Sequence, residues 1–172
     1  MGPDDFAYHL PDPAIAQIPL ADRPSARLLD ALTEPVAHRT VSDLPSLVGP
    51  GDVLVVNDTR VLPARLRATR PTGETAEVLL LRAVDDKGTW EALVRPSRKL
   101  PPGSTLTVDL GLSVEVADDL GEGRRHVRLS SDGPLADALD RCGEMPVPPY
   151  LTTTLDDPER YQTVYSLSLI HI

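Results

Sequence analysis

The stretch VLVVNDTR, Val53 to Arg60, is the sharpest change of character along the chain. Its four apolar residues do not alternate with polar ones, which predicts a strand buried on both faces, as in a parallel or mixed sheet. The next four residues, Asn57, Asp58, Thr59 and Arg60, all carry hydrogen-bonding side chains. Strand ends of open sheets line the crevices where ligands bind, so these residues are candidate ligand contacts. The alternative is that Asn57 and Asp58 cap a turn while Arg60 pairs with Asp58.

Short strands joined by turn residues follow this stretch. The runs AEVLLLR, TWEALVR and LSVEVA are separated by clusters of Gly, Pro and Asp, a spacing that predicts a small antiparallel β-barrel. The strands expected from the sequence cover residues 53–56, 76–82, 89–95, 105–108, 112–117 and 125–129.

Two helical segments are also expected. PLADALDR, 134–141, has proline at its start and Gly143 just past its end, which is typical of a short helix. VSDLPSL, 41–47, predicts a helical turn with Ser42 or Asp43 as its N-cap. The prolines of MPVPPYL then require an extended segment.

The predicted fold is a partial α/β sheet domain with an inserted small antiparallel β-barrel. Residues 1–63 form the first part of the α/β domain, 64–145 the barrel with a short helix, and 146–165 the return to the α/β domain. Residues 166–172 are expected to be a non-native tail, because LSLIHI is also what an in-frame reading of a sequencing adapter encodes. The alternative is a genuine short C-terminal strand.

Composition narrows the functional classes. Cys142 is the only cysteine, which excludes a disulfide within the chain and a Cys-rich metal site and favours a cytoplasmic protein. The four histidines have no ligand spacing, so no metal is expected. No run reaches the length of a membrane span, and the acidic, proline-broken N-terminus is unlike a signal peptide.

Charge is unevenly distributed. The net charge of −9 argues mildly against a surface covered by nucleic acid. Arginines nevertheless cluster in 60–70, 95–99 and 124–128. These clusters are either solvated strand edges or a local basic face on an acidic body.

Several blocks in one order resemble a known enzyme family. The blocks are FAYHLPDPAIAQIPLADRPSARLL, HRTVSDLPSLVGPGDVLVVNDTRVLPARL, AEVLLL, WEALVRPSRKLPPG, GEMPVPPYL and ERYQTVY. From Phe6 to Tyr165 the chain resembles the S-adenosylmethionine:tRNA ribosyltransferase-isomerases of queuosine synthesis. NDTR followed by ARL, then MPVPPY and RYQTVY, is the most specific combination.

The resemblance implies an activity and its partners. S-adenosylmethionine would be the co-substrate and ribosyl donor, without a metal. The acceptor would be the 7-aminomethyl-7-deazaguanine wobble nucleotide in the anticodon loop of tRNA, and the products epoxyqueuosine, adenine and methionine. The full-length protein is expected to be a monomer. This chain, which lacks the family's second half, is expected to be an inactive and marginally stable fragment.

The resemblance also favours site roles for the NDTR segment. Asp58 is the candidate catalytic base, or it orients the substrate; acting as a base would require burial that raises its pKa. Arg60 could hold a carboxylate or phosphate in bidentate fashion. Asn57 and Thr59 could bond ribose hydroxyls.

Other candidates have equally plain structural alternatives. Arg27 could contact phosphate or the donor's carboxylate, or be a surface arginine. Tyr161, Gln162 and Tyr165 could stack on and bond a base, or pack in a strand. Glu144 could be an acid or base, or a helix-end residue without a role.

The barrel supplies a last group of candidates. Arg98 and Lys99 are RNA-binding candidates that could steer tRNA phosphates. His38 and His126 are assigned to structure. Two rival functions remain open, a non-catalytic RNA-binding barrel module and a small-molecule-binding barrel.

Overall fold

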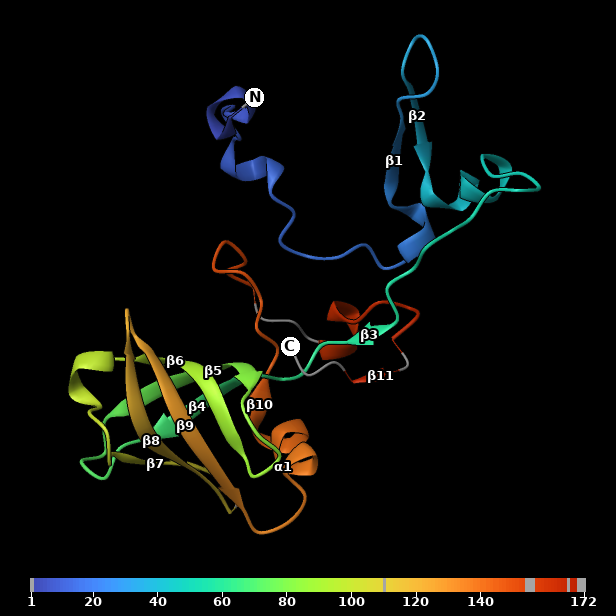
Figure 1. The fold of residues 1–172 in the computed structure, drawn as a ribbon. Coiled ribbons are helices and arrows are strands. Elements are labelled where there is room, and N and C mark those ends of the chain that lie inside the picture. Colours follow the sequence, from blue (N-terminus) through green and yellow to red (C-terminus); the bar gives the residue numbers. More distant parts are fainter. Residues whose placement is uncertain (1, 110, 154–156, 167, 170–172) are drawn as a thin grey trace. The chain divides into compact units, whose positions relative to one another are not determined.

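Six strands close into an antiparallel barrel in the computed structural model, which describes residues 2–109, 111–153, 157–166 and 168–169 (Figure 1). The strands lie in the order β4-β5-β6-β9-β8-β7, and the pair Thr69–Thr107 joins β7 back to β4. The barrel strands are β4 (Arg65–Thr69), β5 (Thr75–Ala83), β6 (Thr89–Arg95), β7 (Thr105–Asp109), β8 (Leu112–Gly121) and β9 (Arg124–Ser131).

The barrel interior is filled by alternate residues of each strand. Along β6, Trp90, Ala92 and Val94 are buried, and the residues between them are only half-buried. The same period of two places Val114 and Val127 at 0% exposure on β8 and β9. Helix α1 (Leu135–Cys142) adds Ala138 and Leu139 to this core.

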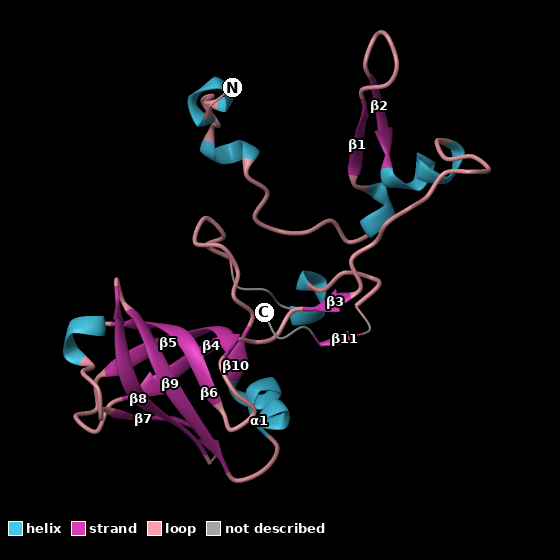
Figure 2. Cartoon of the chain, in the orientation of Figure 1, coloured by secondary structure: helices cyan, strands magenta, loops and turns pink. Residues whose placement is uncertain are grey.

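The remaining elements are short (Figure 2). The other strands are β1 (Arg27–Asp30), β2 (Ala37–Thr40), β3 (Thr59–Arg60), β10 (Gly143–Glu144) and β11 (Ser168–Leu169). The 3-10 helices are η1 (Pro3–Phe6), η2 (Asp12–Ala14), η3 (Arg23–Ser25), η4 (Val41–Ser46), η5 (Ser97–Lys99) and η6 (Pro158–Tyr161).

The chain divides into two compact units. One comprises 1–56 and 148–160, and the other comprises 57–147 and 161–172, which includes the barrel. In the first unit, β1 and β2 form an antiparallel hairpin, and Arg39 donates to the buried Asp30 at 2.9 Å. Gln17 accepts a hydrogen bond from the Thr152 amide at 2.9 Å, which links the two stretches of that unit.

Most expected elements of the barrel are confirmed. The strands expected over 76–82, 89–95, 105–108, 112–117 and 125–129 all form, and several extend further into their turns. The helix expected over 134–141 forms as α1. The sequence did not predict β4, because its alternation of Arg65, Leu66, Arg67 and Ala68 looked like a basic run. The β1–β2 hairpin was not predicted either.

The expected N-cap of the turn at 41–47 was wrong by two or three residues. Thr40 is the N-cap of η4, and Asp43 is its N3 residue. The Asp43 carboxylate accepts from the Thr40 amide at 2.8 Å and from its hydroxyl, so that the two residues form a capping box. These hydrogen bonds from Thr40 lower the pKa of Asp43.

The strand expected at Val53–Val56 is not formed among the described residues. The four residues are 86%, 62%, 88% and 45% exposed, and they have no regular secondary structure. A strand needs a neighbour to satisfy its N–H and C=O groups, and none of the described strands pairs with this one. The prediction of burial on both faces is therefore wrong for this structure.

Only part of the proposed tail is described. The structure describes Ser166 and Ser168–Leu169, whereas 167 and 170–172 lie outside the described residues. Ser168–Leu169 form β11, which pairs in parallel with β3.

Exposed apolar side chains at Val53–Val56 give a testable consequence. A run of exposed, strand-forming residues is a template for pairing between molecules, so the chain should self-associate as its concentration rises. Replacing Val53→Lys and Val55→Lys together should reduce this association, measured by static light scattering.

The control changes Ile18→Lys and Leu32→Lys, whose side chains are 72% and 98% exposed outside the run. Equal improvement in both double variants would show that added charge, rather than the run, is responsible.

Glu91 is a second feature with a measurable effect. Its carboxylate lies between Arg82 at 3.0 Å and Arg124 at 3.3 Å, and it therefore links β5, β6 and β9. The hydrogen bond from Arg82, supported by the charges of Arg82 and Arg124, lowers the pKa of Glu91 from its ordinary value of 4.5. A carboxyl group whose folded pKa is lowered stabilises the fold above its ordinary pKa, and this contribution is lost as pH falls through the folded value.

We expect the melting temperature of Glu91→Gln to fall less than that of the wild type when pH is lowered below 4.5. Circular dichroism melts across this pH range measure the difference. Glu115→Gln is the control, because Glu115 pairs with Arg128 alone and is 49% exposed. If Glu91→Gln and the wild type lose stability in parallel, Glu91 does not make this contribution.

Candidate functional site

The NDTR segment lies within the barrel unit, just before the barrel strands. Asn57 and Asp58 are exposed, and Thr59 and Arg60 are half-buried in β3. The Asn57 side-chain oxygen accepts from the Thr59 amide at 3.0 Å. This contact is the local turn cap that the sequence left open as the alternative role of Asn57. Asp58 is not buried here, so its carboxyl faces solvent.

Gln162 joins the RYQTVY block to the end of NDTR. Its side-chain oxygen accepts from the Val61 amide at 2.8 Å, and its side-chain nitrogen donates to the Val61 carbonyl at 2.8 Å. These residues are 101 positions apart, and Gln162 is only 3% exposed. Next to it, the Thr163 hydroxyl donates to the Asn57 carbonyl at 3.1 Å. Gln162 thus completes the backbone hydrogen bonds of Val61 as a neighbouring strand would, and so positions the end of NDTR.

The GEMP block lies against the other side of this junction. Gly143 approaches so closely that a Cβ there would overlap the Pro63 carbonyl oxygen, which explains why glycine is present. Glu144 accepts from Arg67 Nε at 2.6 Å, and this hydrogen bond raises the pKa of Arg67. Met145 is in weak contact with Gln162 through its sulfur at 3.9 Å. In this structure, Glu144 is the ion-pair partner of Arg67.

The other predicted site residues are dispersed. Arg27 is exposed in β1 of the other unit, paired in register with Thr40. Tyr161 is half-buried at the end of η6, and Tyr165 is 50% exposed. The structure therefore brings Asn57, Thr59 and Gln162 into one neighbourhood.

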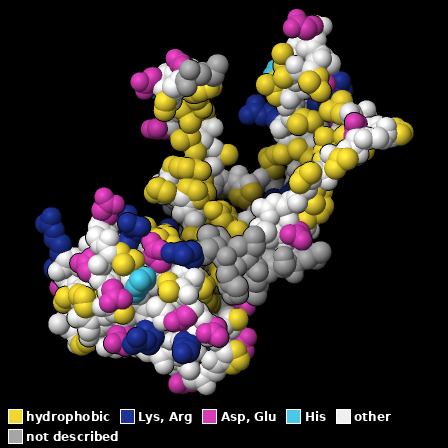
Figure 3. Space-filling view, in the orientation of Figure 1, with side chains coloured by type: hydrophobic (Ala, Val, Ile, Leu, Met, Phe, Trp, Pro, Cys, Tyr) yellow, Lys and Arg dark blue, Asp and Glu magenta, His cyan; other side chains and the backbone are white. Residues whose placement is uncertain are grey.

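The basic candidates of the barrel differ from each other. Arg98 is exposed in η5 and forms no ion pair with any described residue. Lys99 lies 3.3 Å from Glu74, which also pairs with Arg70. Figure 3 shows acidic and basic side chains interspersed over the barrel surface.

The two structural histidines have separate surroundings. His126 Nδ1 lies 3.1 Å from an Asp118 oxygen on the next strand, and His38 pairs in register with Leu29 in the hairpin.

Sequence reasoning missed Arg125 as an individual residue. Its side chain is 7% exposed, although it belongs to the basic run RRHVRL. The missed signal is alternation, because Val127 and Leu129 point inward and Arg125 falls on the same side of the strand. An arginine at an inward position requires specific partners.

The described part of the chain has neither a metal-binding cluster nor a membrane-spanning helix. No group of three His, Cys, Asp or Glu side chains is placed to hold a metal ion. No helix there has the length and apolar character needed to cross a membrane.

The pair of hydrogen bonds at Gln162 yields a prediction. Gln162→Leu removes the hydrogen-bond partner of both the half-buried N–H and the C=O of Val61, which should destabilise the barrel unit by about 1–3 kcal/mol. Urea unfolding followed by fluorescence measures this loss. Gln162→Glu keeps an acceptor, and when its carboxylic acid is protonated it also has a donor, so its loss of stability should be smaller at a pH where the acid is protonated than where it is ionised. If Gln162→Leu unfolds at the same urea concentration as the wild type, the positioning role is wrong.

The chain is similar to proteins of one known family. The profile described as "Queuosine biosynthesis protein" matches residues 3–169. Relatives named S-adenosylmethionine:tRNA ribosyltransferase-isomerase include one from Rubrobacter xylanophilus, 45% identical over 96% of this chain and 49% of its own length. Another, from Clostridioides difficile, is 43% identical over 94% of this chain and 48% of its own.

A solved structure described as S-adenosylmethionine tRNA ribosyltransferase from Thermotoga maritima is also similar. It is 34% identical, with 73% of this chain and 44% of that chain covered, at a TM-score of 0.36. The chain spans about half the length of the curated relatives it matches. Because the family profile extends over nearly all of its residues, the chain belongs to the queuosine biosynthesis protein family.

Proposed function

We propose that this chain is part of an enzyme that transfers and isomerises the ribosyl moiety of S-adenosylmethionine. The acceptor is the 7-aminomethyl-7-deazaguanine wobble nucleotide of tRNA, and the products are epoxyqueuosine in the tRNA, adenine and methionine. The observation that carries the proposal is the match over residues 3–169 to a family whose relatives are named for this donor and for tRNA.

The reaction makes specific demands on the protein. The sulfonium acidifies neighbouring ribose C–H bonds, so a nearby general base can start the rearrangement. The attacking amine must be neutral, adenine must leave, and the wobble base must be unstacked from its loop. A site for this chemistry needs a general base, a cationic group that binds the methionine carboxylate, and hydrogen-bonding groups for the ribose hydroxyls.

The NDTR segment offers these groups. Asp58 is the proposed base, or it orients the donor. It is exposed in this structure, so a substrate can reach its carboxylate, and the role as a base requires that the bound substrate bury it. Arg60 is proposed to hold the methionine carboxylate, and Asn57 and Thr59 to bond the ribose hydroxyls. Gln162 is proposed to support this segment through Val61, which lies directly after Arg60. Tyr161 is proposed to contact a nucleobase of the substrate. Arg27 is proposed to contact an anionic group of the donor or of tRNA.

The proposal extends to the architecture. Val53–Val56 would become an inner strand of an α/β domain into which the barrel is inserted. We propose that the 172 residues alone do not turn over substrate, since relatives of about twice the matched length carry the activity named for them. The complete protein would act as a cytoplasmic monomer.

The test uses a chimera in which residues 1–169 replace the matching half of the Rubrobacter xylanophilus relative. It is incubated with S-adenosylmethionine and tRNA that carries the modified wobble base, and adenine is quantified by chromatography. The chimera should release adenine only when tRNA is present. Asp58→Asn should lower kcat by about a hundredfold or more, the range of general acid–base effects.

Asp86→Asn is the matched control, because Asp86 is exposed in the turn before β6. A folded chimera that binds neither S-adenosylmethionine nor tRNA would refute the proposed function. Binding of tRNA without binding of S-adenosylmethionine would instead favour a non-catalytic RNA-binding barrel.

A further inference from the structure

Two adjoining hollows of the barrel unit open on either side of one loop. The first has a volume of about 500 Å³ and is lined by residues of β6, of η5 and of the β8–β9 turn. The second has a volume of about 740 Å³ and is lined by residues of β4, β5 and η5. They share Arg95, Ser97 and Arg98, so they adjoin each other, and the pair is called the η5 groove below.

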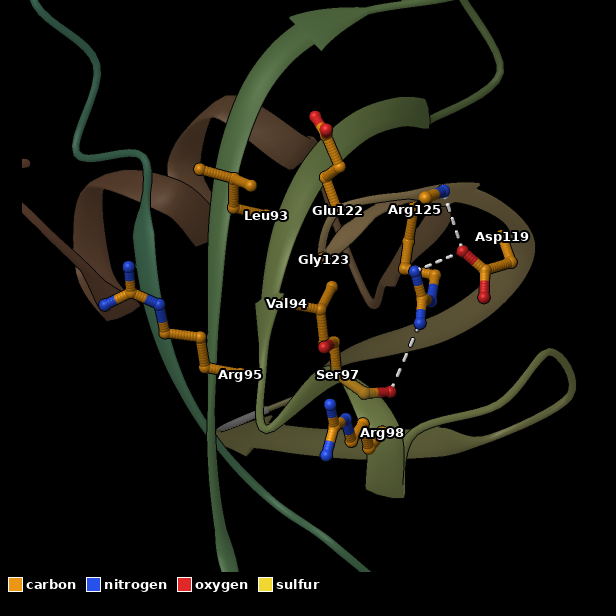
Figure 4. A pocket seen from close by; sticks show the side chains of 10 residues that line it. Leu93, Val94, Arg95, Ser97, Arg98, Asp119, Glu122, Gly123 and Arg125 are labelled. Atoms are coloured by element: carbon orange, nitrogen blue, oxygen red, sulfur yellow. Dashed lines mark hydrogen bonds and ion pairs between the residues drawn. The ribbon is translucent and has the colours of Figure 1, made fainter.

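Arg125 forms one wall of this groove and organises it. Figure 4 shows its guanidinium between Asp119 and Ser97. Nη1 donates to the Asp119 carboxylate and to the Arg124 carbonyl at 2.8 Å, and Nη2 donates to the Ser97 carbonyl at 3.2 Å. Arg125 therefore links β9 to the loop that carries Arg98.

One nitrogen of the Arg125 guanidinium has no hydrogen-bond partner among the described residues. This nitrogen, Nε, is buried. A buried N–H without a partner costs about 1–3 kcal/mol, so such groups call for an explanation such as a ligand. Arg125 is one of the residues that line the first hollow.

The remaining charges leave a positive excess at the rim. Asp119 is already paired with Arg125, and Arg67 with Glu144. Arg95 and Arg98 are exposed and form no ion pair with described residues. Two further acids line the groove: Glu77, which lies 3.9 Å from Arg65, and Glu122, at the tip of the β8–β9 turn, which forms no ion pair with a described residue.

We propose that the η5 groove binds the phosphodiester backbone of RNA, with Arg95 and Arg98 contacting phosphates and Arg125 holding the loop in place. Guanidinium groups match phosphate oxygens in bidentate geometry, and two adjoining hollows that share two arginines suit a chain of anions. None of the described residues that line the groove is aromatic, so these residues offer no surface for stacking bases. The groove therefore positions RNA without reading its sequence.

This inference rests on the proposed function, because it takes RNA as the substrate. It is tested with the 172-residue chain by fluorescence anisotropy, using a fluorescein-labelled RNA stem-loop. Arg95→Gln with Arg98→Gln should weaken binding about tenfold or more and reduce the slope of log K against log salt by about two, one for each phosphate contact. A stem-loop of scrambled loop sequence should bind equally well.

The matched control removes two arginines elsewhere on the barrel. Arg82→Gln with Arg128→Gln changes the net charge equally, and these side chains are 67% and 56% exposed outside the groove. The control should change affinity less than about twofold, because its arginines pair with Glu91 and Glu115. Glu122→Gln should change affinity in the opposite direction and tighten binding severalfold.

Two outcomes overturn the inference. Either the two double variants weaken RNA binding equally, or Glu122→Gln leaves the affinity unchanged while the Arg95 and Arg98 variant binds like the wild type. Failure of the proposed function is separate, since it appears as absent adenine release in the unmutated chimera. In an active chimera, Arg95→Gln with Arg98→Gln should raise KM for tRNA and leave kcat unchanged.

Discussion

The barrel depends on strand β4, which pairs with three different neighbours. It lies between β5 and β7 to close the barrel, and its first residues also pair with β10. Closure removes the unpaired edges that an open six-stranded sheet would expose. β4 follows the NDTR segment, and β10, which contains the first residues of GEMP, pairs with the start of β4. The NDTR and GEMP blocks therefore lie at the same end of the barrel.

At that end, contacts made to backbone groups set the geometry. Gly143 lies against the Pro63 carbonyl, and Gln162 bonds both polar groups of Val61. The GEMP and RYQTVY blocks therefore both contact the backbone that directly follows NDTR. Some family motifs in this chain hold the scaffold, while neighbouring exposed groups such as Asp58 remain accessible to a substrate.

The barrel was largely predictable from sequence because its strands alternate. Trp90, Ala92 and Val94 fall on one face, and Gly- or Pro-containing turns separate the runs. Two other features could not be predicted from a local pattern. The strand assignment at Val53–Val56 depended on a partner that does not lie among the described residues. The environment of Gln162 depended on a contact across 101 positions, which no window of sequence contains. For Asp58 and Arg60, sequence indicated a cluster of polar groups, whereas their roles require a bound substrate.

The position of Trp90 has a practical consequence. It is the only tryptophan, and it is 5% exposed in the barrel core. Intrinsic tryptophan fluorescence therefore reports on the barrel unit alone, while the unit formed by 1–56 and 148–160 contributes no tryptophan signal. Comparing this fluorescence with a whole-chain probe such as far-ultraviolet circular dichroism would show whether the two units unfold as one cooperative body or separately.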